Sequence, residues 1–304
     1  MAGLEKRIFS QMLKTTLIGC GAVAQKLYLK PLQKLERLGL LQVAHLIDSH
    51  ARHAETMKAA FSRAVVHEDL EKALALRDSE LALVLTPTQF HHAHAILALR
   101  HGNHVLCEKP LAINEAHCAE IVQVARSESR VLAVGMVRRF FPSFARLKTH
   151  LDRGDLGTIQ SFEYREGHVF DWDVKTPAGF LKKADGGGGI LFDIGSHAID
   201  FLISLFGDPR LESYADDALR GVEGNVVMRL SFPSCSGTVQ LSWDSPLKSE
   251  LRVVGSRGEA LLRLDQVDKL AIKTAGTFSD VAVDHGFPSD LSLPPARLVP
   301  RLYT

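Results

Sequence analysis

The sequence predicts a two-domain α/β protein, with a doubly wound parallel sheet first and an α+β domain on an open, mainly antiparallel sheet second. Its 304 residues correspond to two domains at roughly 100–200 residues per domain. Up to about residue 134, short apolar segments alternate with helical segments, which is typical of βαβ units. Beyond that point, strand-like segments separated by short turns dominate, which favours antiparallel pairing.

The first half is expected to join its parallel strands through helices. The segment at residues 81–85 is apolar throughout, which suits a strand buried on both faces. Gly39 and Gly102 follow two of the expected helices and are suited to end them. The expected strands lie at residues 15–18, 42–47, 64–66, 81–85, 104–107 and 131–134, and the expected helices at 22–38, 51–61, 68–76, 89–101 and 115–126.

The second half is expected to contain two helices, at residues 143–153 and 191–206. Gly186–Gly189 precede the later helix. They either let the backbone pass close to the substrate or the nicotinamide, or they form a flexible hinge before the helix. We expect one domain over residues 1–140 and another over 141–304, with an irregular Pro- and Ser-rich tail at about 284–304. The expected strands lie at residues 158–165, 222–232, 237–243, 250–254 and 259–264.

Composition excludes several classes of protein. The chain has 36 Lys+Arg against 35 Asp+Glu and a net charge of +1, which argues against a nucleic-acid partner. It has no run of about 18 apolar residues that would predict a membrane span, and its first 13 residues lack the apolar core of a secretory signal. The four cysteines are scattered without a C-x-x-C pair, so a cytoplasmic protein with reduced thiols is expected.

A glycine turn of the form G-x-G-x-x-A follows the first expected strand. Gly19 permits the tight turn, Gly21 lets the backbone approach a pyrophosphate, and Ala24 lets the helix pack closely on the strand. The helix N-terminus offers free N–H groups and a positive dipole end to the phosphates. The residues expected to bind a dinucleotide cofactor here are Gly19, Gly21, Ala22, Val23 and Ala24.

Asp48 ends the second expected strand, 27 residues beyond Gly21. A carboxylate there can accept hydrogen bonds from the adenosine ribose and repel a 2′-phosphate, which favours NAD. The alternative is that Asp48 only caps the following helix. NADP stays open as well, because Ser49, His50 and Arg52 could bind a 2′-phosphate.

Motifs further along the chain resemble those of one oxidoreductase family. They are Thr86-Pro87, His91, Gly102, the segment His104-Val105-Leu106-Cys107-Glu108-Lys109-Pro110, Arg139, Pro142, Gly186–Gly189, and Asp193-Ile194-Gly195-Ser196-His197 with Asp200. In this order and spacing, the chain resembles the Gfo/Idh/MocA family, named after glucose–fructose oxidoreductase and inositol dehydrogenase. The resemblance implies an N-terminal Rossmann domain, a C-terminal domain with a large open sheet, and NAD(P)-dependent redox chemistry at a sugar or polyol carbon.

The chain also departs from the family pattern. Thr88 stands where the family commonly has Asn, and Ala93 where it commonly has Glu. Family members usually continue past the last strands into further helices, whereas this chain ends in the Pro- and Ser-rich tail. A shortened member, a truncated product and a frameshifted end all remain open. We expect either apolar surface left open or a partner subunit over the sheet, and the resemblance favours a homodimer or homotetramer.

Lys109 follows an expected strand at its carboxyl end, where ligands bind in open α/β sheets. The resemblance implies a cis bond before Pro110 that aims the lysine into the cleft. Beside a cationic nicotinamide its ammonium would lose its proton more easily, so it could hold or deprotonate a substrate hydroxyl. The alternative is a surface lysine that neutralises Glu108. Thr86, Pro87, Glu108 and Lys109 are also expected to contact the cofactor.

Asp193, His197 and Asp200 are spaced to share one helix face. A histidine beside carboxylates can take the hydroxyl proton as hydride leaves the same carbon, with Asp193 orienting it or binding another hydroxyl. The alternative is a buried helix that Asp193 caps, and Asp200 is assigned a structural role.

Arg139, Tyr164 and Trp172 are further substrate candidates. No metal is expected, because the spacing of the remaining histidines does not match a closed zinc set; they are His91, His92, His94, His101 and His104.

These residues predict an NAD(P)-dependent oxidoreductase with Lys109, Asp193 and His197 as its catalytic groups. The substrate is a secondary alcohol of a sugar, a sugar derivative or a cyclic polyol. Two alternatives remain: a glycosidase that uses retained NAD, and a non-enzymatic NAD(P)-binding sensor. The catalytic set argues against the sensor, because a sensor does not need it. The sequence does not specify the sugar or the direction of the reaction.

Overall fold

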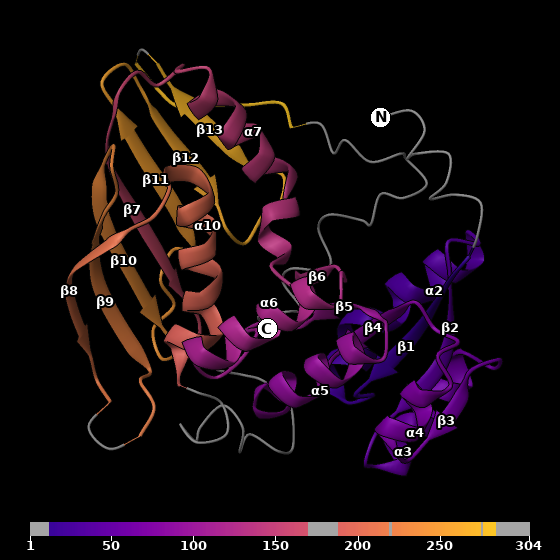
Figure 1. Ribbon diagram of the computed structural model, residues 1–304. Coiled ribbons are helices and arrows are strands. Elements are labelled where there is room, and N and C mark those ends of the chain that lie inside the picture. The colour runs from indigo at the N-terminus through magenta and orange to yellow at the C-terminus, as the bar shows by residue number, and fades with distance from the viewer. Residues whose placement is uncertain (1–11, 170–187, 219–220, 275, 284–304) are drawn as a thin grey trace. The chain divides into compact units, whose positions relative to one another are not determined.

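The computed structural model describes residues 12–169, 188–218, 221–274 and 276–283 (Figure 1). The described chain divides between Gly135 and Met136 into two compact units.

The first unit contains a six-stranded parallel sheet in the order β3-β2-β1-β4-β5-β6. The strand order reverses direction between β1 and β4, and ligands of doubly wound sheets bind outside the carboxyl ends of the strands at this point. The strands are β1 (Leu13–Ile18), β2 (Leu41–Ile47), β3 (Val65–His67), β4 (Leu81–Val84), β5 (His104–Cys107) and β6 (Leu132–Val134).

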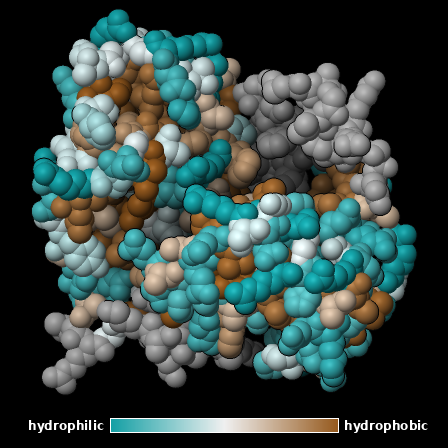
Figure 2. All heavy atoms as spheres, viewed as in Figure 1, coloured by the Kyte–Doolittle hydropathy of each residue, from teal (hydrophilic) through white to brown (hydrophobic). Residues whose placement is uncertain are grey.

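Helices connect these strands, as the alternating pattern predicts. The helix expected at 22–38 is not one continuous α-helix, because the segment η1 (Ala24–Tyr28) near its start is a π-helix. π-Helical turns are rare and occur frequently at functional sites. The other helices are α2 (Leu29–Arg37), α3 (Ala51–Ala60), α4 (Leu70–Ala75), α5 (Thr88–Arg100) and α6 (Glu115–Ser127). Figure 2 shows mainly hydrophilic residues over this unit in the view drawn, with apolar residues scattered among them.

The second unit contains an eight-stranded sheet in the order β14-β13-β12-β11-β7-β10-β9-β8. It is mainly antiparallel, and β7 and β10 form its parallel pair among the described strands. The strands are β7 (Ile159–Gly167), β8 (Arg210–Asp216), β9 (Asn225–Ser231), β10 (Ser236–Ser242), β11 (Glu250–Gly255), β12 (Glu259–Arg263), β13 (Leu270–Lys273) and β14 (Ser279–Asp280). The sequence reading missed β8, β13 and β14. Every residue of β8 is exposed, so it has no alternation of buried and exposed positions to reveal it.

Two helices, α7 (Pro142–Asp152) and α10 (Ser196–Phe206), cover one face of this sheet (Figure 1). The short helices η2 (Val137–Phe140) and η3 (Leu191–Gly195) lead into them. Aromatic contacts anchor α10: Phe206 lies 5.6 Å, between ring centroids, from both Phe162 and Phe232. This packing fixes α10, which carries His197 and follows the η3 turn with Asp193, on the sheet.

The other face of the sheet is mostly polar where the structure describes it. Arg165 pairs with Glu163, and Arg252 pairs with Glu259. Val227 of β9 is 48% exposed, and Leu211 and Tyr214 of the neighbouring strand β8 are 57% and 41% exposed. Ion pairs thus lie on β7, β11 and β12, and the expectation of open apolar surface or a covering partner subunit stays a prediction.

Candidate active site

The glycine turn joins the carboxyl ends of three adjacent strands. Gly19 has φ +97°, and a Cβ there would lie 2.8 Å from the backbone of Leu85 and Thr86, so only glycine fits. Its N–H donates to the Ile47 carbonyl at 2.8 Å. A Cβ on Gly21 would meet only His53 Nδ1, at 4.0 Å. The backbone at Gly21 is thus open to close approach, which a bound pyrophosphate requires.

Asp48 is held by two backbone N–H groups. Cys20 N–H donates to Oδ2 at 2.7 Å, and His50 N–H donates to Oδ1 at 2.8 Å. The N-cap residue of α3 is His50, which makes no side-chain cap bond. Asp48 therefore does not act as the N-cap; its carboxylate ties the glycine turn to the end of β2.

Glu108 and Lys109 follow β5 directly. The Tyr28 hydroxyl donates to Glu108 Oε1 at 2.5 Å, and Lys109 N–H donates to Glu108 Oε2 at 3.0 Å. Burial, and after it the charge of Glu108, raises the pKa of Tyr28, so this phenol stays protonated as a donor. The Lys109–Pro110 bond is cis, as the family resemblance implies. Glu108 thus fixes the main chain at Lys109, and sequence reasoning did not identify Tyr28 as its partner.

His91, at the start of α5, connects two of the loops that carry cofactor and catalytic candidates. Its Nε2 lies 2.7 Å from the Thr86 carbonyl and its Nδ1 lies 2.8 Å from the Pro110 carbonyl, and the residue is 1% exposed. Both partners are acceptors, so a neutral ring donates to one of them and a protonated ring to both. Burial lowers the pKa of His91 most strongly, while the two carbonyls and Glu108 raise it.

Replacing His91 by Phe is expected to reduce NAD affinity and destabilise the protein by about 1–3 kcal/mol, because a buried carbonyl loses its donor. Urea unfolding and a fluorescence titration with NAD measure the two effects. His101→Phe is the matched control, since His101 Nδ1 contacts the Leu97 carbonyl of its own helix, at 2.9 Å, and connects no loops. Equal effects of the two substitutions would contradict a connecting role for His91.

In the second unit, Asp193 lies in η3, and His197, four residues later, lies in the first turn of α10. His197 is buried, at 4% exposed. The start of this helical segment is capped by Glu223, whose Oε1 accepts from Gly189 N–H at 2.9 Å and Leu191 N–H at 3.1 Å. The capping role considered for Asp193 is thus filled by Glu223, a residue that sequence reasoning missed.

Gly189 is required for that arrangement. A Cβ on it would lie 2.0 Å from the Glu223 carbonyl oxygen, so backbone-to-backbone contact explains this glycine. Gly186 and Gly187, together with the substrate candidate Trp172, lie outside the described residues.

Arg139 and Asp200 form a two-bonded ion pair. Arg139 Nε and Nη2 donate to the Asp200 carboxylate at 2.8 and 2.6 Å, and this bonding raises the pKa of Arg139. The pair holds η2 against α10. This contact fits the structural role predicted for Asp200. A substrate bound by Arg139 would have to share the guanidinium group with Asp200.

Tyr164 lies in the interior rather than at a surface where a substrate could reach it. It is 0% exposed, and its hydroxyl donates to Glu166 Oε2 at 2.7 Å. Arg138 donates to both Glu166 oxygens, at 2.7 and 2.6 Å, and to the Tyr164 hydroxyl. Tyr164 therefore belongs to a buried ion-pair network between η2 and β7, and we leave it out of the proposed substrate site.

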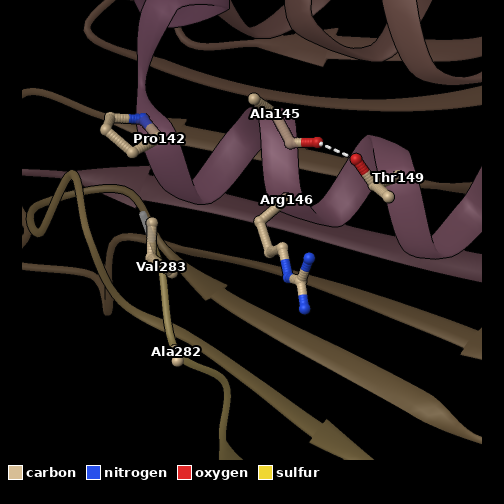
Figure 3. A pocket seen from close by; sticks show the side chains of 6 residues that line it. All are labelled: Pro142, Ala145, Arg146, Thr149, Ala282 and Val283. Atoms are coloured by element: carbon tan, nitrogen blue, oxygen red, sulfur yellow. Dashed lines mark hydrogen bonds between the residues drawn. The ribbon is translucent and has the colours of Figure 1, made fainter. Parts of the chain in front are cut away.

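A hollow of about 500 Å³ lies between α7 and the segment after β14 (Figure 3). Figure 3 shows the Arg146 side chain extending below α7, and Thr149 Oγ1 donating to the Ala145 carbonyl at 2.9 Å. Arg146 is the only ionisable residue among those that line it, and no predicted site residue does so. Without a general base or nucleophile, this hollow does not suit the predicted chemistry.

Two family models match the chain. Residues 13–136 match the oxidoreductase family with an NAD-binding Rossmann fold, and residues 144–261 match the GFO/IDH/MocA C-terminal domain. D-glucoside 3-dehydrogenase of Escherichia coli (strain K12) is 30% identical over 213 residues, which cover 69% of this chain and 58% of that protein. The scyllo-inositol 2-dehydrogenase (NADP(+)) IolU of Bacillus subtilis (strain 168) is 27% identical over 234 residues, 73% of this chain and 68% of that protein.

Solved structures share the fold. Levoglucosan dehydrogenase, in complex with NADH and levoglucosan, has a TM-score of 0.83 at 21% identity and covers 94% of this chain and 85% of its own. KijD10, a 3-ketoreductase from Actinomadura kijaniata in complex with NADP, has a TM-score of 0.80 at 19% identity, with coverages of 96% and 89%. The chain spans 58% of the glucoside dehydrogenase, so the activity of a whole relative is carried over only as a proposal. Among the described residues, no helix is long and apolar enough to cross a membrane.

Proposed function

Because the chain belongs to the Gfo/Idh/MocA family of oxidoreductases, with an NAD-binding Rossmann domain, we propose that it oxidises a secondary alcohol or reduces the corresponding ketone. The substrate class is a sugar, a sugar derivative or a cyclic polyol. Two relatives, a glucoside 3-dehydrogenase and a scyllo-inositol 2-dehydrogenase, support this class. NAD, when bound, supplies the hydride acceptor, and the residues of this chain position the groups and handle the proton.

The observation that carries the proposal is the construction around Lys109. The residue directly follows a strand of the parallel sheet, and its main chain is bonded to Glu108, which Tyr28 holds in turn. In the same unit, a hydrogen bond from Cys20 N–H to Asp48 joins the glycine turn to the end of β2. Doubly wound sheets bind their ligands at the carboxyl ends of the strands, so a lysine that follows β5 is suited to hold a substrate hydroxyl beside a cofactor bound there.

We assign the proton of the alcohol to Lys109 and His197. NAD, when bound, would accept hydride from the carbinol carbon, while the O–H proton would move to Lys109 or His197 and the carbinol carbon would become a carbonyl carbon. Asp193 orients His197 or binds a neighbouring hydroxyl. The reverse reaction returns the proton from the same groups, so the assignment does not depend on direction.

A substrate panel tests this function. Sugars, inositols and sugar nucleotides are incubated with NAD or NADP, and reduced nicotinamide is followed by absorbance. Net reduced nicotinamide with a sugar or polyol is the expected result. Glycoside cleavage without added NAD and without net reduced nicotinamide would instead indicate a glycosidase, and cofactor binding without turnover of any substrate would indicate a sensor.

We expect NAD to bind more tightly than NADP, because the Asp48 carboxylate repels a 2′-phosphate. Asp48→Ala should reduce this preference by about 1–2 kcal/mol, the contribution of one charged hydrogen bond. Fluorescence titrations with both cofactors measure it. Asp48→Asn should also reduce the preference, since it keeps an acceptor for Cys20 N–H while removing the charge that repels the 2′-phosphate. Tighter NADP binding by the unaltered protein would show that Ser49, His50 and Arg52 outweigh Asp48.

We also propose a homodimer or homotetramer that buries the outer face of the second sheet, in a reducing, cytoplasmic setting. The four cysteines are unpaired, which fits reduced thiols. The charges on that face would pair across a polar interface. Light scattering should give a multiple of 33.4 kDa, and a well-behaved monomer would refute the oligomer.

A further inference from the structure

Two histidine side chains and one carboxylate gather at the end of β2. Asp48 Oδ1 lies 3.4 Å from His53 Nδ1 and 3.6 Å from His50 Nδ1. One ligand atom from each of the three residues lies within 4.8 Å of the others. This group is separate from the histidines at positions 91–104, whose spacing does not match a closed zinc set.

The spacing suits a tetrahedral transition-metal ion. Zn²⁺ binds imidazole nitrogen and carboxylate oxygen at about 2.0–2.2 Å, which places neighbouring ligand atoms of a tetrahedron roughly 3.3–3.6 Å apart. Both carboxylate–imidazole distances lie in this range. The Asp48 side chain is 9% exposed and fixed by backbone bonds, whereas those of His50 and His53 are 74% and 44% exposed. One preorganised ligand therefore faces two side chains that solvent reaches.

Among the His, Cys, Asp and Glu side chains that the structure describes, these three form the group, and the Ser49 hydroxyl, 3.1 Å from His50 Nδ1, would have to release that nitrogen to the ion. Cys20 is the nearest thiol in sequence, but burial raises its pKa to about 12, and its Sγ–H donates to the Ile47 carbonyl. A thiol must lose its proton to bind zinc, so Cys20 is excluded. The positive end of α3 weakly opposes a cation, and the Asp48 charge at the same place counteracts it.

We propose that Asp48, His50 and His53 bind one divalent transition-metal ion of the zinc class, and that this ion excludes the dinucleotide. The exclusion rests on the proposed function, in which Asp48 binds the adenosine ribose. The ion uses Asp48 Oδ1 and the two Nδ1 atoms, and water takes a fourth position. Because the metal and the ribose need the same carboxylate, occupancy by one prevents binding of the other.

The first experiment measures zinc binding to the full chain, freed of metal by a chelator, through isothermal titration calorimetry. One equivalent of Zn²⁺ should bind the unaltered protein. His50→Gln and His53→Gln should each weaken it at least about tenfold, since loss of an outer-sphere partner alone typically costs 10–100-fold. His117→Gln is the matched control, because it removes a histidine from another surface group, stacked on His92 at 4.0 Å. Binding that survives both test substitutions, or that His117→Gln abolishes, would overturn the site.

The second experiment titrates NAD by fluorescence at several free Zn²⁺ concentrations. The apparent dissociation constant of NAD should rise in proportion to Zn²⁺ once the site is half filled, and His53→Gln should remove this dependence. Mg²⁺ should have no effect, because it prefers six oxygen ligands. NAD affinity that stays constant while zinc binds would refute the exclusion. Failure of NAD to bind even in chelator would refute the cofactor assignment instead, and the calorimetry would still decide the metal site.

Discussion

Replacing Lys109 by Met is expected to lower turnover by about 10²–10⁴, the usual contribution of a positioned acid–base group. NAD affinity should change by no more than a few-fold, because the expected pyrophosphate and ribose contacts come from Gly19–Ala24 and Asp48. Steady-state kinetics on a substrate found in the panel, with a separate NAD titration, measure both. Lys72→Met is the control, since the Lys72 side chain is 85% exposed on α4 and should leave both values unchanged.

His197→Ala should give a similar loss of turnover. If the two residues act on one proton, the double variant should lose less than the product of the single losses. Near-unaltered turnover in both single variants would refute the assignment, and the segment from Asp193 to His197 would then serve only to pack α10. Loss of folding would also lower activity, so far-ultraviolet circular dichroism must show the same spectrum for each variant.

Breaking the buried Arg138–Glu166 pair is expected to have the largest effect on stability. Arg138 is 2% and Glu166 4% exposed, so Arg138→Met leaves a buried carboxylate without its cation. Such a change typically destabilises by about 3–5 kcal/mol, measured here by urea unfolding. Arg165→Met is the matched control on β7, the strand that carries Glu166. It breaks the exposed pair with Glu163 and should lower the free energy of unfolding by less than about 1 kcal/mol.

A second variant keeps this prediction testable if Arg138→Met does not fold. In Arg138→Met combined with Glu166→Leu, apolar side chains replace both charges, and such replacements are often neutral or stabilising. The double variant should therefore recover most of the lost stability. A single variant that costs no more than Arg165→Met, or a double variant that is worse than the single one, would contradict the role of the ion pair.

The sequence by itself determined the features that depend on local pattern. The alternation of apolar strands and helices up to residue 134 predicted the parallel sheet, and Gly19 and Gly21 predicted the turn that follows its first strand. The family resemblance, which rests on short contiguous motifs, implied the cis bond at Lys109–Pro110 and the second domain. Each single strand, helix or motif is a short contiguous segment, and these segments are compared in chain order. Tertiary context is therefore not needed to recognise them.

Only the tertiary structure decided the partners that hold the candidate site residues. Tyr28 binds Glu108 across 80 positions, and Glu223 caps the segment of Gly189 across 34. Tyr164, a substrate candidate in the sequence, lies in the interior with its hydroxyl hydrogen-bonded to the Arg138–Glu166 ion pair. A side chain shows its residue type in the sequence, but its burial and its partner depend on which distant segment packs against it, and no local periodicity encodes that contact.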